Sequence, residues 1–472
     1  MLRNAYAKGH LVSINPTTGE ELARYPVFDA GQIQSCIAQA HERFQSYRRI
    51  PFAQRSAWLK RVAGILEERK AEFGRLISLE MGKTLASAVA EVEKSAWVCR
   101  YYAAEAEGFL AERSILLRNA YANATGAEHF ASRSGIRYQP LGVILAVMPW
   151  NFPFWQVFRC AAPALMAGNT LLLKHASNVP QSALTLEQIF REGGFPPGVF
   201  QTLLITAAQV AEVVADERVR GAALTGSEAA GSSLARLAGQ HLKKTVLELG
   251  GSDPFIVLPS ADLEAAVATA VTARLINNGQ SCIAAKRFIL HRAIAEPFTA
   301  AMTERFRRLK VGDPLDPQTD VGPLATPSIL QEVDGQVQAL VQAGAKVHIG
   351  GSPWGGNFYP PTILSDIPPD HPVAHQEVFG PVALLFTVPD VSAAIELANN
   401  TPFGLGASAW TTDPEEQERL LEELEAGSVF INGMVKSDPR LPFGGIKRSG
   451  YGRELSREGI LEFVNVKTIW VK

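Results

Sequence analysis

One cysteine in a polar turn is the first candidate for chemistry in this sequence. Cys282 closes the run Asn278-Gly279-Gln280-Ser281-Cys282, and its small, polar neighbours are poor material for a hydrophobic core. A thiol in such a turn can face a cleft and act as a nucleophile. The alternative is an inert, buried cysteine.

The other cysteines, Cys36, Cys99 and Cys160, lie far from one another and from Cys282. No Cys-x-x-Cys pair is present, so neither a metal site nor a disulfide framework has local support. We therefore expect no metal.

A carboxylate that could serve as a base stands in the run Leu247-Glu248-Leu249-Gly250-Gly251. Apolar neighbours disfavour the charged form of Glu248 and would raise its pKa, which suits a general base near neutral pH. The alternative is a salt-bridged glutamate at a domain boundary.

An amide lies within a stiff aromatic run, Pro149–Trp155, where Asn151 is the only side-chain amide. A fixed amide N–H is what an oxyanion hole needs. The alternative is a turn asparagine that bonds its own backbone.

Two further segments could hold a cofactor. Lys174 follows an apolar strand-like run and could meet a ribose or a phosphate. Gly226 and Ser227 follow another such run and precede a helix, whose first N–H groups could bind a pyrophosphate. Thr225 and Glu228 also fit a capping box, which is the structural alternative. No G-x-G-x-x-G accompanies them, so the ordinary dinucleotide fingerprint is absent.

Alternating strands and helices must position these residues. Helical spacing runs through much of 28–110, and a continuous apolar run at 142–147 then predicts a strand buried on both faces. Further helices are expected at 155–167, 181–191 and 209–214, with a fourth after Ser227, and further strands at 170–173, 199–204 and 219–223. This alternation predicts an α/β fold with a parallel, doubly wound sheet, which binds ligands at the carboxyl ends of its strands.

A second α/β region begins near Leu247. It is expected to carry helices at 262–276 and 414–425 and strands near Phe288 and Ala383. Two segments, 129–139 and 463–470, alternate apolar and polar residues as exposed strands do. Exposed strand edges often pair with another chain, although an ordinary edge strand is the alternative.

Length and composition limit the classes of function. The 472 residues suggest two or three domains, and 47% apolar with 19% charged residues is typical of a soluble globular protein. A net charge of −2 gives no reason to expect a nucleic-acid partner. We see neither a signal peptide nor a membrane span, and we expect a cytoplasmic enzyme.

Taken in order, these motifs resemble the aldehyde dehydrogenase superfamily. Beyond those already quoted, the resemblance includes the long runs Glu377–Pro381 and Phe443–Glu454, and it extends over nearly the whole chain. Within the superfamily the sequence is most similar to bacterial succinate-semialdehyde dehydrogenases, as the runs Lys174–Ala176, Gly251–Phe255 and Ala285–Arg287 indicate.

The resemblance implies roles for the matching residues. Cys282 would attack the aldehyde, Asn151 would hold the oxyanion, and Glu248 would activate water against the resulting thioester. Eight residues would bind the cofactor: Trp150, Lys174, Ser177, Gly226, Ser227, Gly250, Glu377 and Phe379.

Departures from the family pattern refine these expectations. Many NAD-specific members have a glutamate where this chain has Ser177, so we expect NADP to be accepted and favoured, with dual use of NAD open. A substrate-binding arginine of the succinate-semialdehyde enzymes matches Arg159, for which a structural ion pair is the alternative. A second arginine of some members falls at Ile276, and Ser437 or Arg440 would take its place.

The implied architecture has three parts. Residues 1–117 and 139–246 would form the NAD(P)-binding domain, 247–440 the catalytic domain, and 118–138 with 441–472 an oligomerisation element that gives a homodimer or homotetramer. The expected substrate is succinate semialdehyde. Glutarate semialdehyde, an uncharged aldehyde and a non-catalytic binding protein on the same fold are the alternatives.

Overall fold

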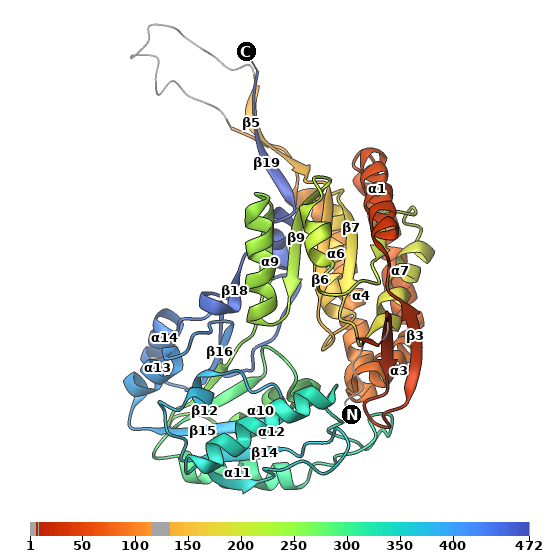
Figure 1. The fold of residues 1–472 in the computed structure, drawn as a ribbon. Coiled ribbons are helices and arrows are strands. Elements are labelled where there is room, and N and C mark those ends of the chain that lie inside the picture. Colours follow the sequence, from red (N-terminus) through yellow and green to blue (C-terminus); the bar gives the residue numbers. More distant parts are fainter. Residues whose placement is uncertain (1–5, 8, 116–132, 472) are drawn as a thin grey trace, which may run out of the picture.

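The computed structural model describes residues 6–7, 9–115 and 133–471. Two α/β units, each built on its own sheet, lie one above the other, and a narrow β-ribbon projects from the upper unit (Figure 1). None of the helices in the described ranges is long and apolar enough to cross a bilayer.

The upper unit contains a six-stranded sheet whose order is β18-β10-β9-β6-β7-β8. Its strands are β6 (Val143–Met148), β7 (Thr170–His175), β8 (Phe200–Thr202), β9 (Val219–Thr225), β10 (Lys244–Glu248) and the short β18 (Gly450–Tyr451). All neighbours are parallel except β18, which runs antiparallel to β10. The predicted parallel, doubly wound sheet is confirmed. Strand order reverses between β6 and β9, which places a crevice at the carboxyl ends of these two strands.

Helices cover this sheet close to their predicted positions: α6 (Trp155–Met166), α7 (Pro180–Glu192), α8 (Val210–Ala215) and α9 (Glu228–Gln240). Ser227, and not Thr225, caps α9, because its side chain accepts a hydrogen bond from Ala230 N–H. The Thr225 hydroxyl instead accepts one from Arg159 at 3.3 Å. The strand expected at 199–204 is shorter because only Phe200–Thr202 pair with β7.

The N-terminal part adds a small sheet and four helices to the upper unit. The sheet joins β1 (Tyr6–Ala7), β2 (His10–Ile14) and β3 (Glu21–Pro26), and the helices are α1 (Ala30–Tyr47), α2 (Phe52–Glu68), α3 (Lys70–Met81) and α4 (Leu85–Phe109). The helical prediction for 28–110 is confirmed. Because α4 packs against both α2 and α6, its inner face reaches the elements that follow β6.

The lower unit contains a seven-stranded sheet of order β13-β14-β15-β12-β11-β16-β17. Its strands are β11 (Asp253–Val257), β12 (Ala285–His291), β13 (Lys346–Ile349), β14 (Thr362–Ser365), β15 (Val382–Val388), β16 (Gly406–Trp410) and β17 (Ser428–Ile431). All pairings are parallel except β13 with β14. The helices are α10 (Leu263–Leu275), α11 (Ala295–Arg307), α12 (Pro327–Gln342), α13 (Val391–Asn399) and α14 (Pro414–Glu423).

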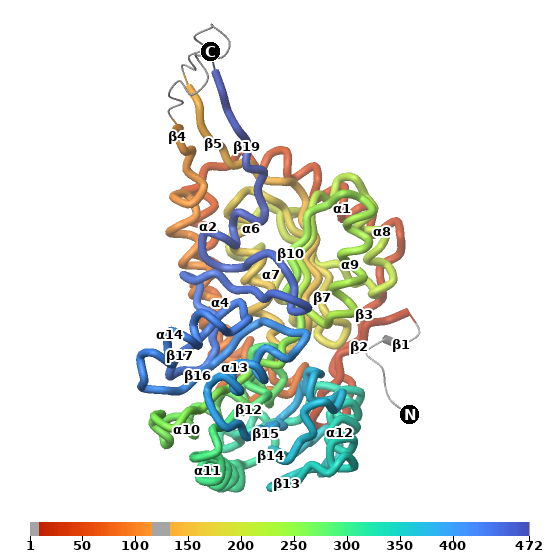
Figure 2. Tube along the Cα trace, turned by 90° about the vertical axis from the view of Figure 1, so that its left-hand side faces the viewer, coloured from red at the N-terminus to blue at the C-terminus, as the bar shows by residue number. Residues whose placement is uncertain are grey.

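The projecting ribbon joins β4 (Arg113–Ser114), β5 (Arg133–Pro140) and β19 (Val464–Val471), with α15 (Ser456–Leu461) leading into it. β19 pairs antiparallel with β5 along its full length and extends away from both units (Figures 1 and 2). Of the predicted oligomerisation segment 118–138, residues 118–132 lie outside the described residues.

Candidate active site

The turn that carries Cys282 begins where α10 ends. The chain passes through a 3-10 turn, Ile276–Gly279, in which Asn277, Asn278 and Gly279 have positive φ angles of 56°, 57° and 78°. Asparagine and glycine tolerate this left-handed conformation better than most residues do. The sequence therefore ends the helix sharply and presents the residues that follow.

Side-chain hydrogen bonds hold this turn although it is buried. The amide of Asn278 donates to the Gly82 carbonyl oxygen at 2.9 Å. The side-chain oxygen of Gln280 accepts from the Ala325 N–H, also at 2.9 Å. The polar residues that are poor core material thus fix the loop by satisfying buried backbone groups.

Cys282 is a free, half-buried thiol that lines two cavities at once. Burial raises its pKa to about 12, while the positive charges of Lys286 and Arg159 act in the opposite direction. A nucleophile shared by two cavities can contact a different molecule on each side.

Asn151 lies beside the nucleophile loop, just after β6. Its side-chain N–H donates to the Gln280 carbonyl at 3.0 Å, and the Asn277 amide donates to the Asn151 carbonyl at 2.7 Å. These bonds join two segments that are far apart in sequence. They fix the amide next to Cys282, where a second amide hydrogen remains for an oxyanion.

Glu248 ends β10 and is buried. Neither of its carboxylate oxygens has a hydrogen-bond partner of good geometry among the described residues, although the Gly445 backbone lies close enough to favour the charged form. Burial raises its pKa well above the usual value, and the charge of Arg159 opposes this. The sequence prediction of a raised pKa agrees with this environment. Glu248 itself does not line either cavity next to Cys282 in the described part of the chain.

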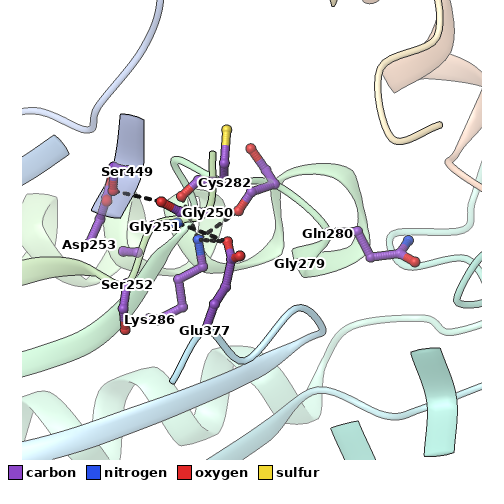
Figure 3. Close-up of polar contacts among 12 residues, drawn as sticks. Gly250, Gly251, Ser252, Asp253, Gly279, Gln280, Cys282, Lys286, Glu377 and Ser449 are labelled. Atoms are coloured by element: carbon purple, nitrogen blue, oxygen red, sulfur yellow. Dashed lines mark hydrogen bonds and ion pairs between the residues drawn. The ribbon is translucent and has the colours of Figure 1, made fainter. Parts of the chain in front are cut away.

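A buried lysine supports the nucleophile loop from the side opposite the thiol. Lys286 Nζ donates to the carbonyl oxygens of Ser281 (2.7 Å) and Cys282 (2.6 Å) and lies 3.3 Å from a carboxylate oxygen of Glu377. The same Glu377 oxygen accepts from the Gly251 N–H at 3.2 Å. Figure 3 shows the Cys282 sulfur pointing away from this network.

The larger cavity is a cleft of about 1250 Å³ at the crevice between β6 and β9. Its lining includes six of the eight residues predicted to bind the cofactor: Trp150, Gly226, Ser227, Gly250, Glu377 and Phe379. The rings of Trp150 and Phe379 meet edge to face with centroids 5.8 Å apart. A Cβ on Gly250 would lie 2.5 Å from a Glu377 oxygen, so any larger residue here would displace the Glu377 side chain.

The remaining two predicted cofactor residues lie just outside this lining. Lys174 is near the carboxyl end of β7, and Ser177 follows that strand. Burial lowers the pKa of Lys174 to about 8. The two residues are on the same sheet edge as the cleft, one strand further from its centre.

The smaller cavity, of about 680 Å³, lies on the other side of Cys282. Its surface is mostly apolar, with Phe152, Trp155, Ile276 and Phe443 among the lining residues, and several polar and charged side chains also line it. This combination is typical of a site for a small molecule.

Arg159 lines this smaller cavity, as predicted, but its charge is already paired. It forms a buried ion pair with Glu454 and stacks over the Phe443 ring, with the guanidinium carbon 4.7 Å from the ring centroid. Arg159 therefore forms the structural ion pair that was considered as the alternative to substrate binding, and it also lines the cavity.

The other two predicted substrate residues have different places. Ser437 lines the cavity and its hydroxyl accepts a hydrogen bond from Lys94 at 2.7 Å. Arg440 does not line it, and its exposed guanidinium pairs with Asp438 at 2.7 Å. Of the two alternatives, Ser437 therefore faces the cavity, whereas Asp438 holds the Arg440 side chain at the surface.

Three residues of the site escaped the sequence reasoning: Lys94, Lys286 and Glu454. Lys94 gave no local signal, because it reaches the site only through packing of distant segments, and Glu454 was noted only as the end of the run Phe443–Glu454. Lys286 stood within a run that served only to indicate a family.

Comparison with known proteins agrees with this geometry. Residues 4–469 match the aldehyde dehydrogenase family. A Synechocystis protein, named as a probable succinate-semialdehyde dehydrogenase of the NADP(+) type, is 57% identical over 98% of this chain and 99% of its own length. An NADP(+) succinate-semialdehyde dehydrogenase from Mycobacterium avium is 54% identical over 98% of this chain and 96% of its own.

A solved structure gives the same result for the fold. The succinic semialdehyde dehydrogenase of Streptococcus pyogenes, in complex with NADP+, superposes with a TM-score of 0.93. The two sequences are 37% identical, and the match covers 98% of this chain and 99% of the Streptococcus chain. The chain belongs to the aldehyde dehydrogenase family, and it is an enzyme that oxidises aldehydes with a nicotinamide cofactor.

Proposed function

We propose that this enzyme oxidises succinate semialdehyde to succinate with NADP+ as its preferred cofactor. The observation that carries the proposal is the position of Cys282 between two cavities. One is a large cleft at the carboxyl edge of a doubly wound sheet, and the other is a small, largely apolar cavity that contains Lys94 and Arg159. Such an arrangement suits a cofactor on one side and a short aldehyde with an anionic end on the other.

In the first step the Cys282 thiolate attacks the aldehyde carbon. The carbonyl oxygen becomes an oxyanion, which the Asn151 amide and the Cys282 backbone N–H would bind. The cofactor, when bound, accepts the hydride that leaves this carbon, and a thioester to Cys282 remains.

In the second step Glu248 would take a proton from water, which then attacks the thioester carbon and releases succinate and the thiol. A buried carboxylate with a raised pKa is suited to this exchange near neutral pH. Glu248 does not line either cavity in this conformation. We therefore include in the proposal either a rotation of its side chain toward Cys282 or an ordered water that connects the two residues.

The residues around the cleft fit a dinucleotide. The N-terminus of α9, with Gly226 and Ser227 in the lining, offers backbone N–H groups to a pyrophosphate. Glu377 would bind the nicotinamide ribose, with Phe379 and Trp150 beside the ring.

The proposed preference for NADP+ rests on Lys174 and Ser177. Ser177 is small and neutral, so it would not repel a 2′-phosphate, and the nearby Lys174 ammonium would attract one. The relatives described above are of the NADP(+) type, which supports the same assignment.

We also propose the three-part organisation described above, with residues 450–451 reassigned to the cofactor-binding part. Residues 1–117 and 139–246 would bind the cofactor, 247–440 would carry catalysis, and 118–138 with 441–472 would mediate assembly into a homodimer or homotetramer. Within the last segment, β18 pairs with β10, so residues 450–451 belong to the cofactor sheet. A cytoplasmic location is part of this proposal.

A substrate panel tests the function directly. The purified enzyme is assayed for NADPH or NADH formation with succinate semialdehyde, glutarate semialdehyde and butanal, each with NADP+ and with NAD+. We expect the highest kcat/KM for succinate semialdehyde with NADP+. A preference for butanal would contradict the substrate, and a preference for NAD+ would contradict the cofactor.

A further inference from the structure

The smaller cavity contains a cation that the sequence reasoning did not assign. Lys94 projects from α4 into the space next to Cys282, together with Arg159 and Ser437. Its Nζ lies 4.4 Å from the ring centroid of Trp155 and donates to the Ser437 hydroxyl at 2.7 Å. Three separate segments of the chain therefore fix the ammonium group in one position.

The charges that line this cavity differ in how far they are neutralised. Arg159 is paired with the buried Glu454, and Glu91 is paired with the buried Lys83 at 2.5 Å. Lys94 forms no ion pair with a carboxylate among the described residues, and it donates a hydrogen bond to the neutral Ser437 hydroxyl. The cavity thus has a net positive charge at Lys94.

The hydrogen-bonding groups at this point match a carboxylate. An ammonium has three donors, and Lys94 uses one for Ser437 and directs its charge toward the Trp155 face. The Ser437 hydroxyl accepts that bond and keeps its own proton, which has no acceptor within the described part of the chain. At least one N–H and one O–H, side by side, therefore remain for the two oxygens of an anionic end group.

We propose that Lys94, with Ser437, forms the main anchor for the substrate carboxylate, while Arg159 chiefly holds Glu454 and the cavity wall. This inference deepens the proposed function and rests on it. It assigns selectivity for ω-carboxylated over uncharged aldehydes to a helix that contributes no other reacting group.

The surroundings of Lys94 also give a pH signature. Burial and repulsion from Arg159 lower its pKa to about 8, Asp438 and Glu91 raise it, and Lys436 lowers it. Because only the ammonium form attracts a carboxylate, raising the pH through this region should raise KM for succinate semialdehyde. KM for butanal should not follow.

The test compares four full-length enzymes: wild type, Lys94→Met, Lys94→Arg and Lys436→Met. Lys436 is an exposed lysine near the same loop that does not line the cavity, so its variant is a matched control. We expect Lys94→Met to lose about tenfold to a hundredfold in kcat/KM for succinate semialdehyde, the usual effect of removing a hydrogen bond to a charged group. The loss for butanal should be under about twofold, Lys94→Arg should recover part of the selectivity, and Lys436→Met should match wild type.

Inhibition by the product succinate separates this inference from the proposed function. If wild type fails to prefer succinate semialdehyde but succinate inhibition weakens at least about tenfold in Lys94→Met, only the proposed function falls. If wild type shows the preference and Lys94→Met keeps it, with unchanged succinate inhibition, the inference about Lys94 is overturned. Equal losses for both aldehydes would overturn it as well, because they would indicate a purely structural role.

Discussion

The thiol of Cys282 lies in surroundings that oppose its ionisation, and two cations partly offset this. Burial raises its pKa to about 12, and Lys286 contributes the largest opposing effect. Lys286 touches the carbonyl of Cys282 and not its sulfur, so it favours the thiolate through its charge while it fixes the loop.

This arrangement predicts the pH dependence of thiol reactivity in the enzyme without cofactor. The rate of alkylation of Cys282 by iodoacetamide should rise steadily from pH 7 to pH 10, because a thiol with a pKa near 12 shows no plateau there. Removal of a nearby cation raises the thiol pKa further, so Lys286→Met should slow alkylation about tenfold at a given pH. A plateau below pH 8, or an unchanged rate in Lys286→Met, would contradict this.

The ion pair between Arg159 and Glu454 leads to a prediction about stability. Both side chains are buried, so Arg159→Met would leave an unpaired carboxylate in the interior. Breaking a buried pair in this way typically costs about 3–5 kcal/mol. The thermal midpoint should therefore fall, and adding Glu454→Gln should restore much of it.

A single Arg159→Met variant with an unchanged thermal midpoint would show that the pair is not structural. The double variant, Arg159→Met with Glu454→Gln, also allows the kinetic role of Arg159 to be measured. If it keeps the selectivity for succinate semialdehyde over butanal, Arg159 is not the main carboxylate anchor.

At the scale of elements, the turn after α10 depends on close backbone approach. A Cβ on Gly279 would lie 2.3 Å from the Gly380 carbonyl oxygen, and the φ angle of 78° is also unfavourable for alanine. Gly279→Ala should therefore displace the nucleophile loop and reduce kcat by at least about a hundredfold, as misplacement of a reacting group does.

Gly108→Ala is the matched control for this change. Gly108 lies in α4, and a Cβ there would have no atom within 4 Å. We expect full activity and a gain of about 0.5–1 kcal/mol in stability, since alanine replaces glycine inside a helix. Comparable losses of activity in both variants would contradict the role assigned to the turn.

Elements with a clear period were predictable, and contacts between distant elements were not. The apolar run before Met148 and the helix that follows Phe154 gave β6 and α6 nearly their observed bounds, because burial on both faces and helical spacing are visible locally. Lys94 is different, since it reaches the cavity next to Cys282 only because α4 packs on α6. Nothing in the residues around Lys94 indicates that packing.

At the scale of the whole molecule, the β5–β19 ribbon exposes apolar side chains away from both sheets. Val466 is 55% exposed and Trp470 48% exposed, and apolar side chains on such a strand are usually buried against another chain. We therefore expect a homo-oligomer in which this ribbon is covered. Val466→Lys with Trp470→Lys should yield smaller particles in sedimentation, whereas a monomeric wild type would contradict the proposed assembly.

Residues of both units line the cleft beside Cys282, and the proposed reaction depends on a covalent intermediate at this thiol. The most direct measurement is mass spectrometry of acid-quenched enzyme after mixing Glu248→Gln with succinate semialdehyde and NADP+. Without the base, hydrolysis slows and a thioester should accumulate. The peptide that contains Cys282 should therefore carry a succinyl group once each enzyme molecule has formed one NADPH. NADPH formation without any adduct on Cys282, or an adduct on another residue, would contradict the account.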